Sequence, residues 1–494
     1  DCAETHSADD DGAVEAYLDS ADEVSQNGGS VNPVVPGGSF FESADYIGAI
    51  GDEDWTEGWT VAGSVNNAET PDLGCPEGTT DSSREIDGAA VCELSGEITR
   101  DLTLRSGRLY ELVGKVVIGG DNSSSATLSI PAGVTVFGGS TSDFLVISRG
   151  SRLEATGSRN APVVFTGLDD LEGNADIDTS RGLWGGIWIN GNAPINDCPA
   201  GIEGGTAGCT KEGEANSGLF GGDVADDDSG RLNYVVVKYA GSNVDPQNQL
   251  NGIAFPGGGS ATEVDFVQVH NNLDDGIEFF GGTVSARHVI LTGNADDSLD
   301  WTDGWVGKIQ YLIINQTDAG DSGIEADNRS DDPAVTPVSL PKIANMSING
   351  NAASRAIRVR AGSGLELYNS TVQGNDRCFV VESAESLALL GTGIQLGGVS
   401  LDCVDPLDAA VQAEIDASEN VSTDGTLVSA IDLSADDFFD NTTFVGAIEN
   451  VDEDWTTGWA FGMPDASGVF GCPVGTTEIA AIDGTTTTCS IAGT

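Results

Sequence analysis

The chain has 494 residues, of which 79 are acidic and 20 basic, giving a net charge of −59. Such a charge repels nucleic acid and is stable only where cations screen or bind it, so nucleic-acid binding is excluded, whereas salt water or a bound divalent metal fits. Glycine reaches 67 residues and aromatic residues only 6%, which favours short strands and turns. No apolar run of about eighteen residues is present, so we predict no transmembrane helix.

Residues 1–36 are acidic and rich in small residues, and they end in a Gly/Pro-rich stretch. We interpret them as a tether or docking arm, with a disordered terminus as the alternative. No basic leader precedes them, so the chain reads as a mature exported product. Cys2 has no partner in the local pairing of the other cysteines, and it is predicted to form an intersubunit disulfide or to carry a lipid tether.

A module at residues 37–99 recurs at residues 433–494. Both copies contain FF, GAI, DEDWTxGW and GCPxGTT, followed by a second Cys at the same distance. The first copy continues into a β-rich body, whereas the second ends where a new body would begin. A solenoid has two strand edges that must be capped or used, so the copies are either two similar caps or matching ends through which subunits abut.

Residues 100–403 contain alternating apolar strands interrupted by longer inserts. Two phrases, Asn272-Leu-Asp-Asp-Gly-Ile-Glu and Asn294-Ala-Asp-Asp-Ser-Leu-Asp, lie 22 residues apart. A strand, a tight turn and another strand at this period predict the coils of a parallel β-solenoid. Residues 404–432 are expected to be a connector, and Pro406–Glu419 is the best helix candidate in the chain.

The repeat also predicts a register. We expect one inward column of apolar residues, with the next residue of each strand pointing outward because side chains alternate. The expected inward residues are Ile277, Leu299, Ile324, Ile357 and Val380, and the outward ones are Glu278, Asp300, Glu325 and Arg358. Adjacent strands lie about 4.8 Å apart, so stacked carboxylates repel one another and need a positive partner. Arg358 can serve Glu325, but Glu278 and Asp300 have no such neighbour in the sequence.

The acidic residues of these coils are the candidate metal site. Calcium takes six to eight oxygens in flexible geometry, which stacked turns can deliver. An alternative is that the Asp side chains accept hydrogen bonds from turn amides, while Asn272, Asn294 and Asn375 form an asparagine ladder. The predicted Ca²⁺ ligands are Asp274, Asp275, Glu278, Asp296, Asp297, Asp300 and Asp303.

Eight tryptophans form four pairs with three residues between the members. A Gly between the rings of a pair suggests a tight turn with structural packing, and the alternative is sugar stacking on exposed rings. Catalysis has little support, because the chain contains three His and lacks GxSxG, HExxH and phosphate-loop motifs. A lyase would need a base beside Ca²⁺, for which Lys308, Arg358 and Arg360 are candidates. No catalytic residue is assigned.

The nine cysteines contain no CxxC pair, so local disulfides in an oxidising compartment are favoured over metal thiolates. After Cys2, pairing in sequence order predicts the disulfides Cys75–Cys92, Cys198–Cys209, Cys378–Cys403 and Cys472–Cys489.

Three phrases, DDGIEFFGGTV, GNADDSLDWTDGWVGKIQYLI and RGLWGGIWINGNAPIN, resemble a group of secreted bacterial surface proteins with a right-handed parallel β-helix. The similarity covers roughly residues 100–403. It implies the fold and an extracellular location, but no reaction, because the group has no agreed catalytic residues.

We therefore predict an all-β protein, a right-handed parallel β-helix with small disulfide-bearing terminal modules. Its predicted function is that of a non-enzymatic, Ca²⁺-stabilised structural protein of the bacterial cell surface, a homo-oligomer that assembles head-to-tail into a filament or layer. The alternative is a carbohydrate-active β-helix protein, either a polysaccharide lyase or an adhesin that binds surface glycans.

Overall fold

The computed structural model describes residues 74–245, 248–351, 354–407, 411–413, 420–462, 476–478 and 489–491. The chain divides into two units, Asp1–Glu69 and Thr70–Thr494, and the first lies outside the described residues. The predictions for the N-terminal arm, for Cys2 and for the first copy of DEDWTxGW therefore fall outside the description.

The second unit opens with a hairpin that begins the coil stack. Strand β1 (Thr80–Ile86) is antiparallel to β2 (Ala89–Ile98), and the disulfide Cys75–Cys92 ties the segment before β1 to β2. β2 then pairs in parallel with β4 (Leu109–Ile118). The coils therefore begin with β2, slightly before the predicted boundary at residue 100.

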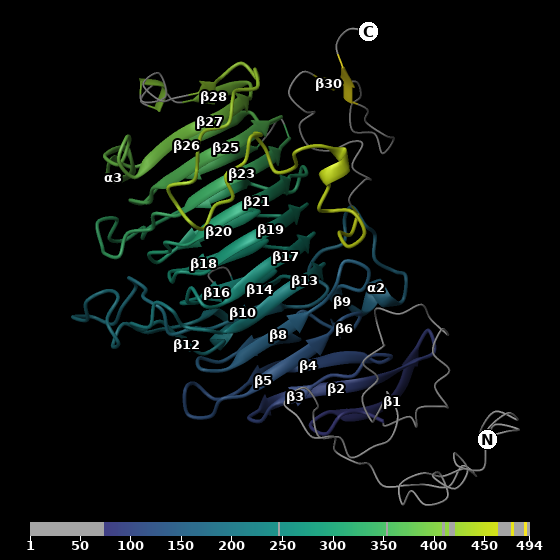
Figure 1. The fold of residues 1–494 in the computed structure, drawn as a ribbon. Helices are drawn as coiled ribbons and strands as arrows, with labels where there is room; N and C mark the ends of the chain where they lie inside the picture. Colours follow the sequence, from purple (N-terminus) through teal and green to yellow (C-terminus); the bar gives the residue numbers. More distant parts are fainter. Residues whose placement is uncertain are drawn as a thin grey trace, which may run out of the picture. The chain divides into compact units, whose positions relative to one another are not determined.

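From β2 onward the strands stack in parallel, one coil above the next (Figure 1). The N-terminal coils are built from β2, β3 (Leu102–Thr103), β4, β5 (Thr127–Pro131), β6 (Thr135–Gly138), β7 (Phe144–Ile147), β8 (Arg152–Thr156) and β9 (Val163–Gly167). The predicted right-handed parallel β-helix is confirmed.

Later coils each contribute one long and one short strand, which form two faces. The long-strand face consists of β13 (Gly230–Lys238), β17 (Glu263–His270), β19 (Ser285–Thr292), β21 (Lys308–Asn315), β23 (Lys342–Asn349), β25 (Leu365–Gln373) and β27 (Ile394–Asp402). The short-strand face consists of β10 (Gly186–Ile189), β16 (Ile253–Pro256), β18 (Ile277–Phe280), β20 (Leu299–Thr302), β22 (Ser322–Ala326), β24 (Arg355–Val359), β26 (Arg377–Val381) and β28 (Asp405–Leu407).

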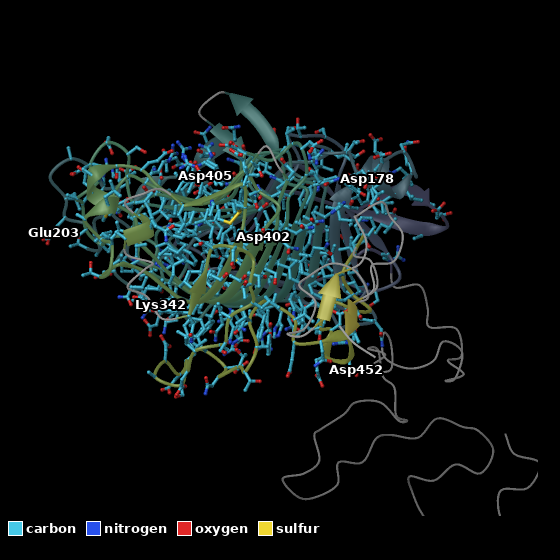
Figure 2. The ribbon with its side chains drawn as sticks, turned by 90° about the horizontal axis from the view of Figure 1, so that it is seen from above. Asp178, Glu203, Lys342, Asp402, Asp405 and Asp452 are labelled. Atoms are coloured by element: carbon cyan, nitrogen blue, oxygen red, sulfur yellow. A yellow bond between two sulfur atoms is a disulfide. The ribbon has the colours of Figure 1, made fainter. Side chains whose placement is uncertain are left out.

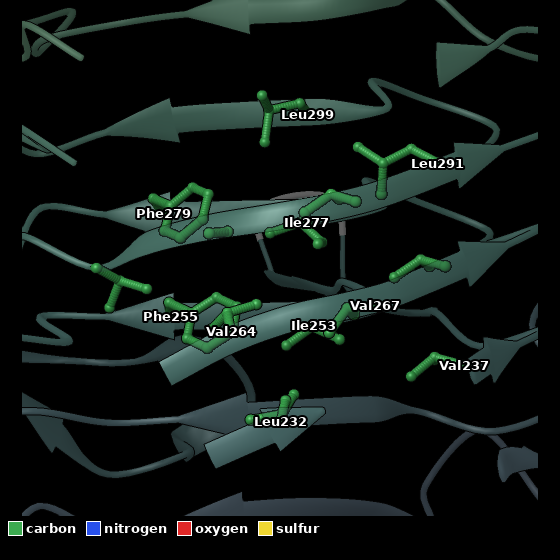
Figure 3. Packing of buried hydrophobic residues seen from close by; sticks show 14 of the residues in the cluster. Leu232, Val237, Ile253, Phe255, Val264, Val267, Ile277, Phe279, Leu291 and Leu299 are labelled. Carbon is green, nitrogen blue, oxygen red and sulfur yellow. The ribbon is translucent and has the colours of Figure 1, made fainter. Parts of the chain in front are cut away.

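The core lies between these faces and is built from stacked columns of identical or similar apolar residues (Figure 3). On the short-strand face one column runs through Ile253, Ile277, Leu299, Ile324, Ile357 and Phe379, all buried. Burying one such side chain contributes about 1.5–3 kcal/mol. The predicted column is correct up to Ile357, but Phe379 rather than Val380 continues it toward Leu407, and Val380 instead pairs with Arg358.

Excursions leave the coils between strands. They include α2 (Leu168–Leu171), the pair β11 (Lys211–Glu212) and β12 (Leu219–Phe220) with the 3-10 helix η1 (Glu214–Asn216) between them, the hairpin β14 (Ser242–Asp245) and β15 (Asn248–Leu250), and α3 (Ala384–Leu387). The disulfide Cys198–Cys209 closes a further loop. Exposed acids such as Asp178, Glu203 and Asp452 lie at the periphery (Figure 2).

The connector differs from the sequence prediction. Asp405–Leu407 is strand β28, paired in parallel with β26, so no helix begins at Pro406. Residues 411–413 are helical, and much of the predicted helix lies outside the described residues. Strand β29 (Val421–Ser422) pairs with β27, so coil pairing continues past residue 403. The predicted disulfide Cys378–Cys403 is confirmed.

Residues 431–462, which we call the strap, run back along the long-strand face. Near the later coils, Leu433 and Phe439 are buried against Ala344. Nearer the earlier coils, Trp455 and Trp459 pack with Val236 and neighbouring residues. The 3-10 helix η2 (Val451–Glu453) lies within the strap (Figure 1, yellow). The described first part of the C-terminal module therefore covers the side of its own β-helix.

The strands β30 (Thr476–Glu478) and β31 (Cys489–Ile491) form an antiparallel pair after the strap. Cys472, the predicted partner of Cys489, lies outside the described residues. Within the described part of the chain, no helix has the length and apolar character needed to cross a membrane.

Candidate metal and ligand site on the short-strand face

A row of charged side chains follows the short strands on the side facing away from the core. Register pairs Ala254 with Glu278, Glu278 with Asp300, Asp300 with Glu325, and Glu325 with Arg358. We call Glu278, Asp300 and Glu325, together with Asp274, Asp275, Asp296 and Asp297 of the preceding turns, the carboxylate row. Parallel pairing forces these acids into contact because the strand spacing is about 4.8 Å.

In the turns before β18 and β20, some of these carboxylates accept hydrogen bonds from main-chain N–H groups. Asp275 Oδ1 accepts the main-chain N–H of Asp297 at 3.0 Å, and Asp297 Oδ1 accepts that of Ser322 at 2.7 Å. The main-chain N–H of Asn272 donates to Asn294 Oδ1 at 3.0 Å. The predicted turn hydrogen bonds are thus present, and the Asp275 and Asp297 bonds use one oxygen of each carboxylate.

The asparagine ladder is shorter than predicted. Asn272 and Asn294 are adjacent rungs, but Asn375 Nδ2 instead donates to Gln316 Oε1 and Ser354 Oγ. Gly276 is required between the rungs, since a Cβ at this position would lie 2.4 Å from Asn294 Nδ2. This close approach explains the Asp-Asp-Gly sequence at the turn.

The carboxylate oxygens converge in three overlapping groups, in each of which one oxygen per residue lies within 4.8 Å of the others. The groups are Asp274–Asp275–Asp296, Asp275–Glu278–Asp300 and Asp296–Asp297–Asp321. Six of the seven predicted ligands belong to these groups. Asp321, an exposed member, was not predicted.

The seventh predicted ligand, Asp303, lies apart from the groups. Its carboxylate forms an ion pair with Lys211 at 3.1 Å, and Lys211 also pairs with Asp197 at 2.7 Å. A carboxylate already neutralised by a lysine has little need of a cation. Asp303 therefore serves to hold the loop that carries β11.

One end of the carboxylate row is covered by inserted segments. Gln249 of β15 donates from Nε2 to Asp274 Oδ1 at 2.9 Å, and its main-chain N–H donates to Glu214 of η1 at 2.9 Å. Asp274, Asp275 and Glu278 are buried beneath these segments, whereas Asp296 and Asp300 are partly exposed. The row therefore has a covered end at β18 and an open end toward β22.

The electrostatics of the row are unfavourable without a cation. Burial, and then the charges of Asp296 and Glu214, raise the pKa of Asp274 to about 7. Burial, and then neighbouring carboxylates, raise the pKa of Asp275, Glu278, Asp297 and Asp300 well above ordinary values. Two charges at the strand spacing repel by about 3–4 kcal/mol at an effective dielectric constant of about 20, more than the roughly 1 kcal/mol of a typical hydrogen bond.

Positive side chains compensate only the open end. Arg358 Nη1 lies 2.8 Å from Glu325, and Arg360 pairs with Glu325 and Asp327. Among the described residues, no Lys or Arg forms an ion pair with any other member of the row. The predicted pairing of Arg358 with Glu325 is confirmed.

A buried amide lies against Glu278 at the covered end. Asn251 is only 2% exposed, and its Nδ2 donates to Glu278 Oε2 at 2.5 Å, while its Oδ1 has no hydrogen-bond partner. An unpaired buried acceptor costs about 1–3 kcal/mol. A hard cation takes both carboxylate and amide oxygens, so this donor set fits Ca²⁺.

The other sequence candidates lie elsewhere or are inaccessible. Lys308 is on the long-strand face and pairs with Asp436 of the strap. His270 is buried, which lowers its pKa to about 4. No described tryptophan is more than 9% exposed, so the predicted structural role fits these rings, and stacking of sugars on them is not supported. Glu214 and Asn251 were not predicted. Glu214 reaches the site from an insert, and Asn251 lies in a turn that has no recognisable sequence motif.

A family described as a pectate-lyase-like β-helix domain matches residues 96–460, which is more than half of the chain. The chain belongs to this family. Membership agrees with the β-helix that the sequence resemblance implied.

No curated protein matches the chain. A solved structure that matches is the enzymatically active domain of tailspike protein 2 of bacteriophage CBA120, at 12% identity and a TM-score of 0.22. The match covers 65% of this chain and 48% of the phage chain, so this pectate-lyase-like β-helix protein spans about half the length of that structure.

Proposed function

We propose that this protein is an extracellular, Ca²⁺-dependent carbohydrate-binding β-helix protein, whose ligand is an acidic glycan bound at the carboxylate row. The observation that carries the proposal is the set of buried carboxylates at the covered end, which form no ion pair with a described Lys or Arg. Asn251, which donates to Glu278 from Nδ2, has an Oδ1 without a hydrogen-bond partner. The family is described by its likeness to pectate lyase, an enzyme named for an anionic polysaccharide.

The proposed ion binds at the covered end. Asp275, Glu278 and Asp300 offer carboxylate oxygens, and Asn251 offers an amide oxygen. Calcium would supply positive charge that neutralises the row and could share its coordination with a carboxylate of the glycan. Without such a cation, the net charge of −59 would repel an anionic polymer.

Arginine side chains near the open end form the second part of the proposed glycan site. Arg355, Arg358 and Arg360 lie within six residues of sequence, and their side chains are 29%, 18% and 32% exposed. Arginine presents planar donors that match carboxylate groups. All three already pair with carboxylates of the chain, so an acidic sugar next to the ion would share these guanidinium groups on β24 and directly after it. The arginines are proposed as binding residues rather than as catalytic bases.

The proposal replaces the structural role favoured by the sequence. The three disulfides are consistent with an oxidising, extracellular compartment. Head-to-tail assembly remains a prediction, and it cannot use the strap while this segment covers its own β-helix. A tether through Cys2 also remains a prediction.

Short oligomers of galacturonate test the proposal. With the full chain in Ca²⁺, we expect saturable binding that falls at least tenfold when a chelator is added and at least fivefold for Asp300→Asn. Asp452→Asn, which removes an exposed acid on the strap, is the matched control and should bind like the wild type. Equal affinity with and without Ca²⁺, or binding only to neutral oligosaccharides, would refute the proposal.

A further inference from the structure

The long-strand face carries a second ordered row of side chains, independent of the proposed glycan site. Seven successive strands place one residue each in the left-handed region, with φ between 47° and 67°. The register between neighbouring strands aligns these positions. We call this the ladder, and it consists of Tyr234, Phe266, His288, Tyr311, Asn345, Asn369 and Gly398.

The first four rungs of the ladder form a continuous ring stack. The ring centroids of neighbouring members are 4.3, 4.2 and 4.7 Å apart. Trp455 and Trp459 of the strap approach this stack edge-on, with Trp459 5.7 Å from Tyr234 and Trp455 5.0 Å from His288. Edge-to-face geometry is favourable for aromatic rings, so the stack is a receptor for two indoles.

Side-chain amides beside the ladder bind the main chain of the strap. Gln310 donates to the carbonyl of Asp440 and accepts its N–H, and Gln268 binds Phe461 in the same way. Asn369 binds the N–H and carbonyl of Ile431. Paired main-chain contacts of this kind recognise an extended segment, while the rings set its register.

The chain contains a second segment that shares the aromatic residues and the GAI sequence of the strap. Phe438 and Phe439 of the strap correspond to Phe40 and Phe41, Gly446–Ile448 to Gly48–Ile50, and the two indoles to Trp55 and Trp59. The distance from the first Phe to GAI is identical in both copies, whereas the distance from GAI to the first Trp is two residues shorter in the first copy. One chain thus contains one ladder and two segments that carry the paired Phe residues, GAI and the paired indoles.

We infer that the ladder is a docking site for the duplicated segment, and that residues 40–59 of a second copy of this chain occupy it when the strap of the first copy leaves. The copies would then be joined by strap exchange. The chain's own strap has the advantage of a high effective concentration, so weakening the strap should promote exchange.

The two segments differ at a residue that contacts Asn345 of the ladder, so their affinities should differ. Thr442 Oγ1 contacts Asn345 at 3.0–3.1 Å, whereas the first copy has Ala44 at this position. We therefore expect a peptide of residues 436–462 to bind more tightly than one of residues 38–62. Ala44→Thr in the second peptide should recover part of the difference.

Fluorescence anisotropy with labelled peptide 38–62 tests the inference on the full chain. The peptide should bind the variant Trp455→Ala/Trp459→Ala at least tenfold more tightly than the wild type. A peptide carrying Trp55→Ala/Trp59→Ala should lose at least tenfold. If peptide 436–462 binds and peptide 38–62 does not, or if neither binds, the inference is wrong.

Crosslinking provides a test with the strap intact. Ser347 Oγ lies 3.0 Å from the N–H of Ala447, whose counterpart is Ala49. Mixing a Ser347→Cys chain with an Ala49→Cys chain in a glutathione buffer should give at least tenfold more interchain disulfide than mixing it with a Ser64→Cys chain. Equal yields would contradict strap exchange.

Discussion

Calcium is expected to raise the melting temperature of the protein at pH 8 by roughly 3 °C at a concentration of about 100 Kd. At pH 4 the effect should nearly vanish, because protons then occupy the carboxylate row. A bound cation relieves the mutual repulsion of ionised carboxylates, whereas protonated carboxyl groups are poor ligands for it. Differential scanning calorimetry at both pH values, with Ca²⁺ or with chelator, measures this difference.

In the presence of a chelator, the stability of the folded chain should change with pH in one direction. The pKa of Asp274 is about 7 in the folded chain, compared with about 4 when unfolded, so between these values the folded chain binds more protons. Stability should therefore fall as the pH rises from about 4 to about 7. Calcium should reverse most of this loss.

A variant separates the row from general charge effects. Asp300→Asn should raise stability in chelator at pH 8, because a carboxyl group buried among other acids is replaced by a neutral amide, and should reduce the gain from Ca²⁺ by at least half. Asp452→Asn should change neither quantity. A melting temperature of the wild type that is independent of Ca²⁺ at pH 8 would contradict the account.

The second large effect is expected for Trp305→Ala, which should lower the free energy of unfolding by roughly 3–5 kcal/mol. Trp305 is fully buried, stacks on Phe279 at a centroid distance of 4.1 Å and donates to the carbonyl of Val284 at 3.0 Å. The substitution would leave a large cavity and an unpaired carbonyl. Urea unfolding measures the loss.

Trp305→Phe is the matched control for this position. It keeps a stacked ring but removes the indole N–H, so a loss of about 1–2 kcal/mol is expected. Both variants should retain Ca²⁺-dependent glycan binding while folded, since the indole faces the core. A loss below about 1 kcal/mol for Trp305→Ala, or selective loss of glycan binding, would show that the ring has another role.

The sequence predicted the coils because their apolar residues alternate at a period that only stacked strands explain. The inward column was correct wherever a polar residue alternated with an apolar one, as at Glu278 and Asp300. It failed at β26, where Phe379, Val380 and Val381 are all apolar. Alternation carries no information in such a strand, so the shift of one residue at Val380 could not be detected.

The carboxylate row was predictable because its members repeat along the chain at the coil period. Asn251 and Glu214 were not, since neither belongs to the Asn–Asp–Asp phrase and their approach depends on how the inserts fold back. The duplication predicted the C-terminal module but not its packing on the ladder. That packing requires left-handed residues at one register, a property of the folded coils that Tyr234 and Phe266 do not reveal in the sequence.

Isothermal titration calorimetry of Ca²⁺ binding by the full chain at pH 7.5 tests the central claim most directly. In buffers of different ionisation enthalpy, we expect saturable binding with proton release, because carboxyl groups with raised pKa values must release their protons to the buffer when the ion binds. Binding should be lost in Glu278→Gln/Asp300→Asn and retained in Asp452→Asn. The same saturable binding in the wild type and the double variant, or no binding to either, would contradict the assignment of the carboxylate row as a calcium site.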